Sequence, residues 1–71
     1  MFIILEKESA SIYARLFEVI SDQDDVIDEL LEAGFAEITR CHKRDASDWL
    51  NDYFEKHNLD PEYQHVNYRK W

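Results

Sequence analysis

One acidic stretch, residues 16–39, constrains this chain more than any other feature. It holds eight of the sixteen acidic residues and no lysine or arginine, so the net charge of −8 lies entirely within it. The rest of the 71-residue chain carries eight acids and eight bases. The same stretch also contains an apolar set that can build a core: Val26, Ile27, Leu30 and Leu31. We therefore expect this stretch to contribute both core and charged surface.

The spacing of that apolar set predicts a first amphipathic helix at about residues 22–33. Positions i, i+1, i+4 and i+5 place the four side chains in one narrow stripe. Ser21 is the expected N-cap, and the acids that follow it suit the positive end of the helix dipole. Gly34 is expected to end the helix in a left-handed conformation, with Phe35 making the hydrophobic contact that accompanies such an end.

A second amphipathic helix is predicted at about residues 46–57. Its apolar face repeats with helical spacing. The residues on that face are Ala46, Trp49, Leu50, Tyr53, Phe54 and His57. Asp45 is the expected N-cap, with Asp48 three residues later. Asn58 is expected to stop the helix and Leu59 to make the contact at its end.

Strands account for most of the remaining chain. Residues 2–5 are apolar and predict a strand that is buried on both faces, and residues 35–42 predict another strand. Residues 12–20 fit either strand alternation or a helical face. We favour the strand because β-branched and aromatic residues are enriched there, which would make residues 2–20 a β-hairpin. Residues 62–71 fit an edge strand or a loose tail.

Together these elements predict one α+β domain spanning residues 1–71. Its two amphipathic helices would pack on a three- to four-stranded antiparallel sheet, in the order β-β-α-β-α with a possible last strand. The apolar content of 45% favours a folded chain over a disordered one. A chain of this length buries only about 60% of its unfolded surface, so its aromatic residues are expected to supply much of the core.

We expect the protein to be cytoplasmic. The apolar run at the N-terminus is only five residues long and lacks a basic segment before it, so it is too short for a signal peptide or a membrane span. Cys41 is the only cysteine. A lone thiol excludes an intramolecular disulfide and suits a reducing compartment.

No pattern in the chain predicts catalysis, a cofactor or a metal site. The acids at residues 22–25 lack the glycine and the later oxygen ligand of a calcium loop. Zinc-binding atoms occur at Cys41, His42, His57 and His65. Their spacing fits no common structural zinc site, and one glycine cannot form a glycine-rich phosphate loop. We therefore expect a protein that is not an enzyme.

The six acids of the predicted first helix form the candidate partner-binding surface. These are Asp22, Asp24, Asp25, Asp28, Glu29 and Glu32. Like charges four residues apart lower the stability of a helix, so this acidic helix bears a cost in stability. Solubility alone can nevertheless explain a negative net charge. Carboxylates about 6 Å apart along a helix can imitate backbone phosphates. The expected partner is therefore a basic protein surface, such as the groove of a nucleic-acid-processing protein.

In length, acidity and aromatic content the chain resembles the small proteins with which phages disable host machinery, such as anti-CRISPR and anti-restriction proteins. The resemblance is one of composition. It implies an inhibitor that blocks a basic nucleic-acid-binding groove, with nucleic-acid mimicry as one route.

Two alternatives stay open. One is a structural or accessory module, either a homodimer or an antitoxin-like partner of a basic protein, that acts through a strand edge or an aromatic patch. The other is a single-stranded nucleic-acid binder that uses the C-terminal tail, because stacking rings and bases occur together there. The tail residues concerned are Tyr63, His65, Tyr68, Arg69, Lys70 and Trp71. The negative charge makes direct binding to nucleic acids or anionic membranes the less expected outcome.

Overall fold

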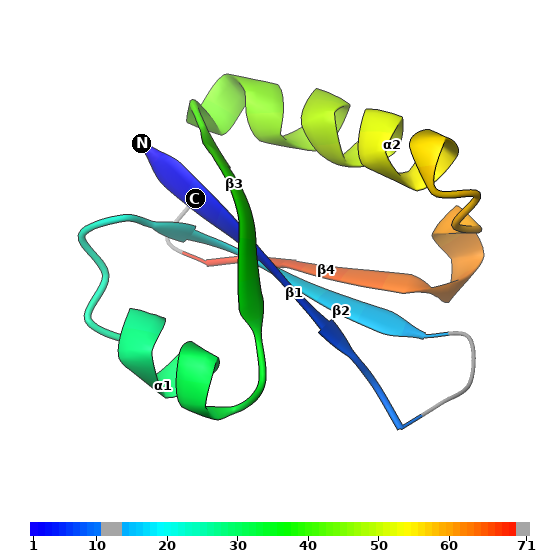
Figure 1. Cartoon of the computed structure of the whole chain (residues 1–71). Helices are drawn as coiled ribbons and strands as arrows, with labels where there is room; N and C mark the ends of the chain where they lie inside the picture. The colour runs from blue at the N-terminus through cyan, green and yellow to red at the C-terminus, as the bar shows by residue number, and fades with distance from the viewer. Residues whose placement is uncertain (11–13, 70–71) are drawn as a thin grey trace.

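A four-stranded sheet lies between two helices in the computed structural model, which describes residues 1–10 and 14–69 (Figure 1). The strands are β1 (Phe2–Glu8), β2 (Arg15–Ser21), β3 (Ala36–Cys41) and β4 (Gln64–Tyr68). The helices are α1 (Ile27–Glu32) and α2 (Ala46–Lys56), and two 3-10 turns, η1 (Lys43–Asp45) and η2 (Pro61–Tyr63), precede α2 and β4. The strand order across the sheet is β3-β1-β2-β4.

β1 occupies the interior of the sheet and is buried on both faces, as its unbroken apolar run predicted. Ile3, Ile4 and Leu5 are all fully buried. Successive strand side chains point to opposite faces, so Ile4 packs toward α2 while its two neighbours pack toward α1. A strand covered on both sides has no polar face to expose, which explains its composition.

Two separate core clusters follow from this alternation. The cluster under α2 contains Ile4, Phe17, Val19, Ala46, Leu50 and Phe54. The cluster under α1 is smaller and contains Ile3, Leu5, Ile20 and Leu30. Most of the core therefore depends on α2.

The predicted β-hairpin is confirmed. β1 and β2 pair antiparallel from Phe2 opposite Ser21 to Glu8 opposite Arg15. The helical alternative for residues 12–20 is therefore wrong over residues 15–20, while residues 12 and 13 lie outside the described part of the chain. β3 is also confirmed within one residue at each end.

The prediction of a fully antiparallel sheet is wrong, because β4 pairs with β2 in parallel. The last strand itself is confirmed, over Gln64–Tyr68 and at the edge of the sheet. The reason for its direction lies in the connection. α2 carries the chain across one face of the sheet, so β4 runs in the same direction as β3, which is the usual outcome of a helical crossover.

The first helix is shorter than predicted, because residues 22–26 form turns and α1 begins only at Ile27. Asp24 is buried, and its Oδ1 accepts a hydrogen bond of 3.1 Å from the Val26 amide. Ser21 ends β2 and does not cap the helix; its Oγ accepts from the Gln23 amide at 3.3 Å. Short polar side chains that bind nearby amides compete with helix formation in this way.

Both predicted helix ends are confirmed. Gly34 has a positive φ of 102°, and the Phe35 amide donates to the Leu30 carbonyl at 3.0 Å. Asn58 has a φ of 53°, and the Leu59 amide donates to the Phe54 carbonyl at 2.8 Å. These bonds are the six-to-one bonds of the Schellman motif.

The start of α2 differs from the prediction. Asp45 makes no side-chain capping bond, because it is the last residue of the 3-10 turn η1 and already has helical dihedral angles. A capping side chain needs an extended backbone at its own position. The body of the helix, Ala46–Lys56, agrees with the predicted range to within one residue.

A register shift in β3 decides which of its side chains share a face. The shift falls opposite Ile4 and Leu5, where Thr39 and Glu37 are the paired residues and Ile38 lies between them. As a result, Ile38 packs against the α2-side core, and Glu37 forms an ion pair with Arg40 three residues later.

No helix in the described part of the chain is long and apolar enough to cross a membrane.

Candidate protein-binding surface

Four of the six predicted binding acids lie together on exposed surface in and just before α1. They are Asp25, Asp28, Glu29 and Glu32, and we call them the acidic α1 surface. None of the four forms an ion pair with any residue of the described part of the chain. Their charges are therefore available to a partner.

The other two predicted acids have structural roles. Asp24 is only 6% exposed and bonds the Val26 amide as described above, so the structure removes it from the candidate surface. Asp22 lies 3.7 Å from the N-terminal ammonium group. The sequence pattern could not separate these residues from their neighbours, because all six were assigned to one helix.

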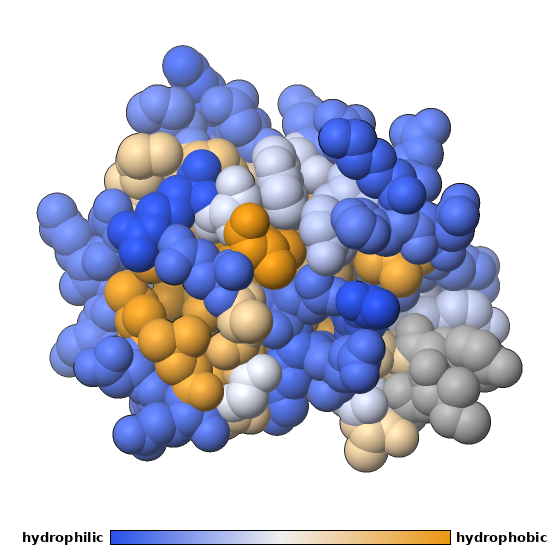
Figure 2. All heavy atoms as spheres, in the orientation of Figure 1, coloured by the Kyte–Doolittle hydropathy of each residue, from blue (hydrophilic) through white to orange (hydrophobic). Residues whose placement is uncertain are grey.

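Leu31 is an apolar residue of α1 that lies outside the core. It was expected to be buried with its neighbours, but it is 46% exposed. Figure 2 shows an apolar patch over α1 with hydrophilic side chains around it. An apolar centre inside a charged rim is the usual layout of a protein–protein contact. Its exposure leaves Leu31 available for contact with a partner.

A second row of acids runs along the outer side of α2, and the sequence analysis missed it. Asp45, Asp48, Asp52 and Glu55 are spaced three, four and three residues apart, which places them on one side of a helix. All four are exposed, and none is ion-paired within residues 1–10 and 14–69. The spacing of these four acids is visible in the sequence.

An aromatic ladder lies along α2. Trp49 stacks on Tyr53 with ring centroids 5.1 Å apart, and Tyr53 lies 4.3 Å from the ring of His57. Together with Asp52 and Lys56 these rings line a hollow of about 440 Å³. His57 is exposed, so it stands at the rim of the helix face that the spacing assigned to the core.

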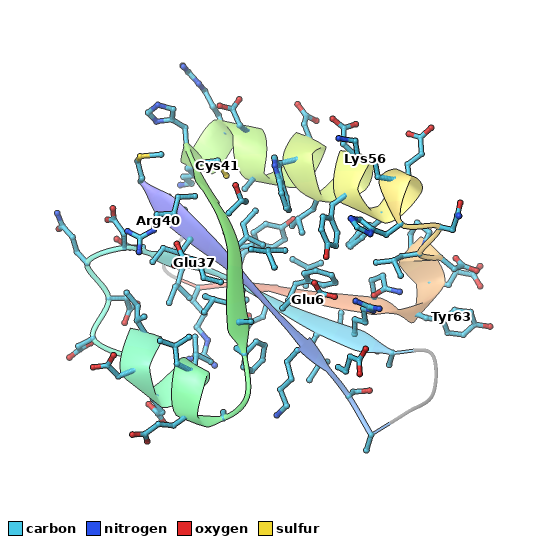
Figure 3. All side chains as sticks on the ribbon, in the orientation of Figure 1. Glu6, Glu37, Arg40, Cys41, Lys56 and Tyr63 are labelled. Atoms are coloured by element: carbon cyan, nitrogen blue, oxygen red, sulfur yellow. The ribbon has the colours of Figure 1, made fainter. Side chains whose placement is uncertain are left out.

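A charged network fastens α2 to the hairpin. The Tyr53 hydroxyl donates to Glu6 Oε2 at 2.7 Å, and Arg15 Nη1 donates to the other oxygen of the same carboxylate. Burial and the bond to Glu6 raise the pKa of Tyr53 above its ordinary value. Tyr53 therefore stays protonated at neutral pH and acts as a structural donor. Figure 3 shows Glu6 between the helix and the strands.

The tail is held to the sheet by a buried carboxylate. Glu18 is 8% exposed, and the Arg69 guanidinium lies 2.9 Å from it, with the Asn67 amide donating to both of its oxygens. Tyr63 and Tyr68 are both substantially exposed. One of the two tail bases is thus already neutralised, which weakens the case for a nucleic-acid-binding tail; residues 70 and 71 lie outside the described range.

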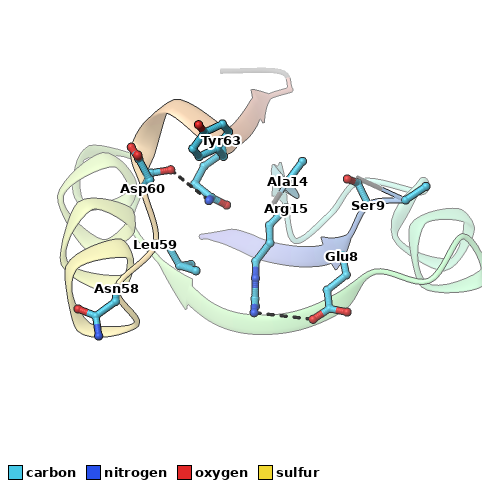
Figure 4. Close-up of a pocket in the computed structure, with 10 residues that line it drawn as sticks. Glu8, Ser9, Ala14, Arg15, Asn58, Leu59, Asp60 and Tyr63 are labelled. Carbon is cyan, nitrogen blue, oxygen red and sulfur yellow. Dashed lines mark hydrogen bonds and ion pairs between the residues drawn. The ribbon is translucent and has the colours of Figure 1, made fainter. Parts of the chain in front are cut away.

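A hollow of about 480 Å³ lies between the end of the hairpin and the segment after α2 (Figure 4). Its charged groups are already engaged: Arg15 pairs with Glu8 at 3.7 Å, and Asp60 accepts a bond from the Glu62 amide at 3.0 Å. The structure groups no three or more metal-binding side chains among the residues that it describes. We find no constellation there that would carry a reaction.

We expect Cys41 to be a slow nucleophile. Its side chain packs against the α2-side core, and burial, together with the charge of Asp45, raises the pKa of the thiol above its ordinary value. Only the thiolate reacts, so alkylation by iodoacetamide at pH 8 should be at least about threefold slower in the folded protein than in urea. The Asp45→Asn variant should react slightly faster. Equal rates in folded and unfolded protein would contradict this expectation.

Comparisons of the chain with protein-family models, with curated proteins and with solved structures found no match.

Proposed function

We propose that the protein binds a basic surface of another protein through the acidic α1 surface and Leu31. The observation that carries the proposal is the combination of the two features on one short element. Four carboxylates without ion pairs in the described chain lie in or just before the same short helix as an apolar side chain that is 46% exposed. Electrostatic attraction would speed the encounter, and burial of Leu31 would stabilise the complex.

The class of partner follows from the charge. A basic groove that normally holds nucleic acid offers the opposite sign to this surface, so occupation of the groove would inhibit the partner. α1 has six residues and is therefore about 9 Å long, which covers few phosphate positions. We infer that the protein blocks such a groove by local contact more than by imitation of an extended nucleic acid. The resemblance to phage inhibitors in size and composition supports the same proposal.

The homodimer remains a second candidate because β3 and β4 are both sheet edges. Exposed strand edges are ready sites for pairing with another chain. The charge argues against this candidate, because two copies with a net charge of −8 each repel one another.

Charge reversal on α1 tests the proposal. The D28K/E32K variant places two bases on the acidic α1 surface, and the control variant A10K/E62K/H65K makes the same change in net charge at exposed positions outside both rows of acids. Immobilised protein would be used to capture nucleic-acid-binding proteins from a bacterial lysate, with duplex DNA as competitor. We expect wild type and control to retain a basic protein that DNA displaces, and D28K/E32K to retain at least about tenfold less. Equal capture by D28K/E32K and wild type would refute the proposal.

A further inference from the structure

β3 presents an open sheet edge between the two helices that carry the rows of acids. Its one neighbouring strand in the sheet of the described chain is β1. In an antiparallel ladder about half of the N–H and C=O groups of an edge strand point away from its partner. Figure 1 shows β3 crossing the front of the molecule, with α2 above it and α1 below it. The outward backbone groups of β3 thus lie between the two helices.

A hollow beside β3 could accept side chains from an added strand. It has about 480 Å³ and is lined by Ala36 and Ile38 of β3 and by Glu6 and Lys7 of β1, among others. It forms where β1 continues past the start of β3. The aromatic ladder lines a second hollow on α2, and Trp49 and Tyr53 of that ladder pack against the same core cluster as Ile38. The register shift at Ile38 turns this side chain toward α2, and bulges often re-aim a side chain beside a binding site in this way.

The charges around this edge define what fits it. The strand itself is nearly neutral, because Glu37 and Arg40 form an ion pair with each other. Lys7 lies over the ring of Phe35 at 5.4 Å. α1, which carries the acidic α1 surface, lies on one side of the edge, and α2, which carries the second row of acids, lies on the other. An extended segment with alternating basic and apolar side chains matches both the charge and the hollows.

We propose that β3 is a docking edge to which an extended basic segment of a partner protein adds as a further strand. Backbone bonds to β3 would supply affinity, and the flanking acids would select basic side chains, as in other cases of strand addition. The inference rests on the proposed function, since it specifies how the basic partner is held. A second copy of the chain is disfavoured, because pairing two β3 edges would bring four acidic helices together.

The test uses a synthetic peptide of eight alternating lysine and valine residues as the probe. Two further peptides carry N-methyl groups, one on every valine amide and one on every lysine amide. Each modification removes the donors along one edge of the extended peptide and keeps the charge and the side chains. Titration of the ¹⁵N-labelled protein at about 50 mM salt would measure binding to each peptide.

We expect the unmodified peptide to bind, to shift the amide signals of residues 36–41 and to slow the exchange of their amide protons. One of the two methylated peptides should bind at least tenfold more weakly than the other. If both bind as well as the unmodified peptide, or if the shifts are confined to α1, strand addition is wrong although the acidic α1 surface still attracts bases. Absence of binding, or a dimer in sedimentation whose β3 signals depend on protein concentration, would also overturn the inference.

The D28K/E32K variant separates this inference from the proposed function. If that variant no longer captures a basic partner while N-methylation has no effect on peptide binding, the surface is right and the docking edge is wrong. If N-methylation weakens binding while the D28K/E32K variant captures its partner as wild type does, β3 is a docking edge and the proposed role of α1 fails.

Discussion

The Phe17→Ala variant should be largely unfolded at 25 °C. Phe17 is 1% exposed and lies at the centre of the α2-side core. Its ring packs edge-on against Phe54 at 5.2 Å and against Tyr53 at 6.1 Å. Removing a buried phenylalanine costs about 3–5 kcal/mol, and a single core in a domain this small rarely supplies more than about 3–5 kcal/mol of net stability. The expected loss is therefore as large as the whole free energy of unfolding of such a domain.

Near-ultraviolet circular dichroism and urea denaturation would measure this effect. Phe17→Leu keeps most of the volume and should remain folded, with a loss of about 1 kcal/mol. Leu31→Ala removes a comparable apolar side chain from the surface and should cost less than about 1 kcal/mol. A cooperative unfolding transition in Phe17→Ala close to that of the wild type would contradict the assignment of this residue to the core.

Replacing Arg69 with methionine should lower the free energy of unfolding by about 2 kcal/mol. Among the described residues, Arg69 is the cation that forms an ion pair with Glu18, whose carboxylate is almost entirely buried. Breaking a buried pair from one side leaves an uncompensated charge. The guanidinium itself is 42% exposed, so water reduces the effect below that of a fully buried pair. Asn67 remains to donate to the carboxylate.

Thermal denaturation of three variants would check this expectation. Arg40→Met removes a guanidinium from the exposed pair with Glu37 and should change stability by less than about 0.5 kcal/mol. The double variant E18L/R69M removes both charges and should recover most of the loss, because the buried carboxylate no longer needs a partner. Similar losses for Arg69→Met and Arg40→Met would show that Glu18 is well hydrated in the folded protein.

Several elements could be predicted because local chemistry decides them. Gly34 and Asn58 end their helices in left-handed conformations, which few residues adopt without strain. The aromatic and aliphatic spacing of α2 leaves one face to bury, and that face is the one the core uses. The continuous apolar run of β1 needs cover on both sides, and it receives that cover from α2 and α1.

Other features depended on contacts between distant residues. The direction of β4 follows from the path of α2 over the sheet. The sequence of the tail contains no sign of that path. Asp24 and Asp28 look alike in sequence, yet one is buried in a turn and the other is exposed. Leu30 and Leu31 are neighbours, and the short α1 can turn only one of them into the core.

Composition and tertiary structure thus explain different properties of the acidic stretch at residues 16–39. Its composition alone determined that this part of the chain would carry the net charge, because no base in the stretch can balance it. The tertiary structure decided which carboxylates are offered to a partner and which are used inside the fold. The reason is physical: charge belongs to each residue, whereas exposure and pairing depend on what the folded chain places beside it.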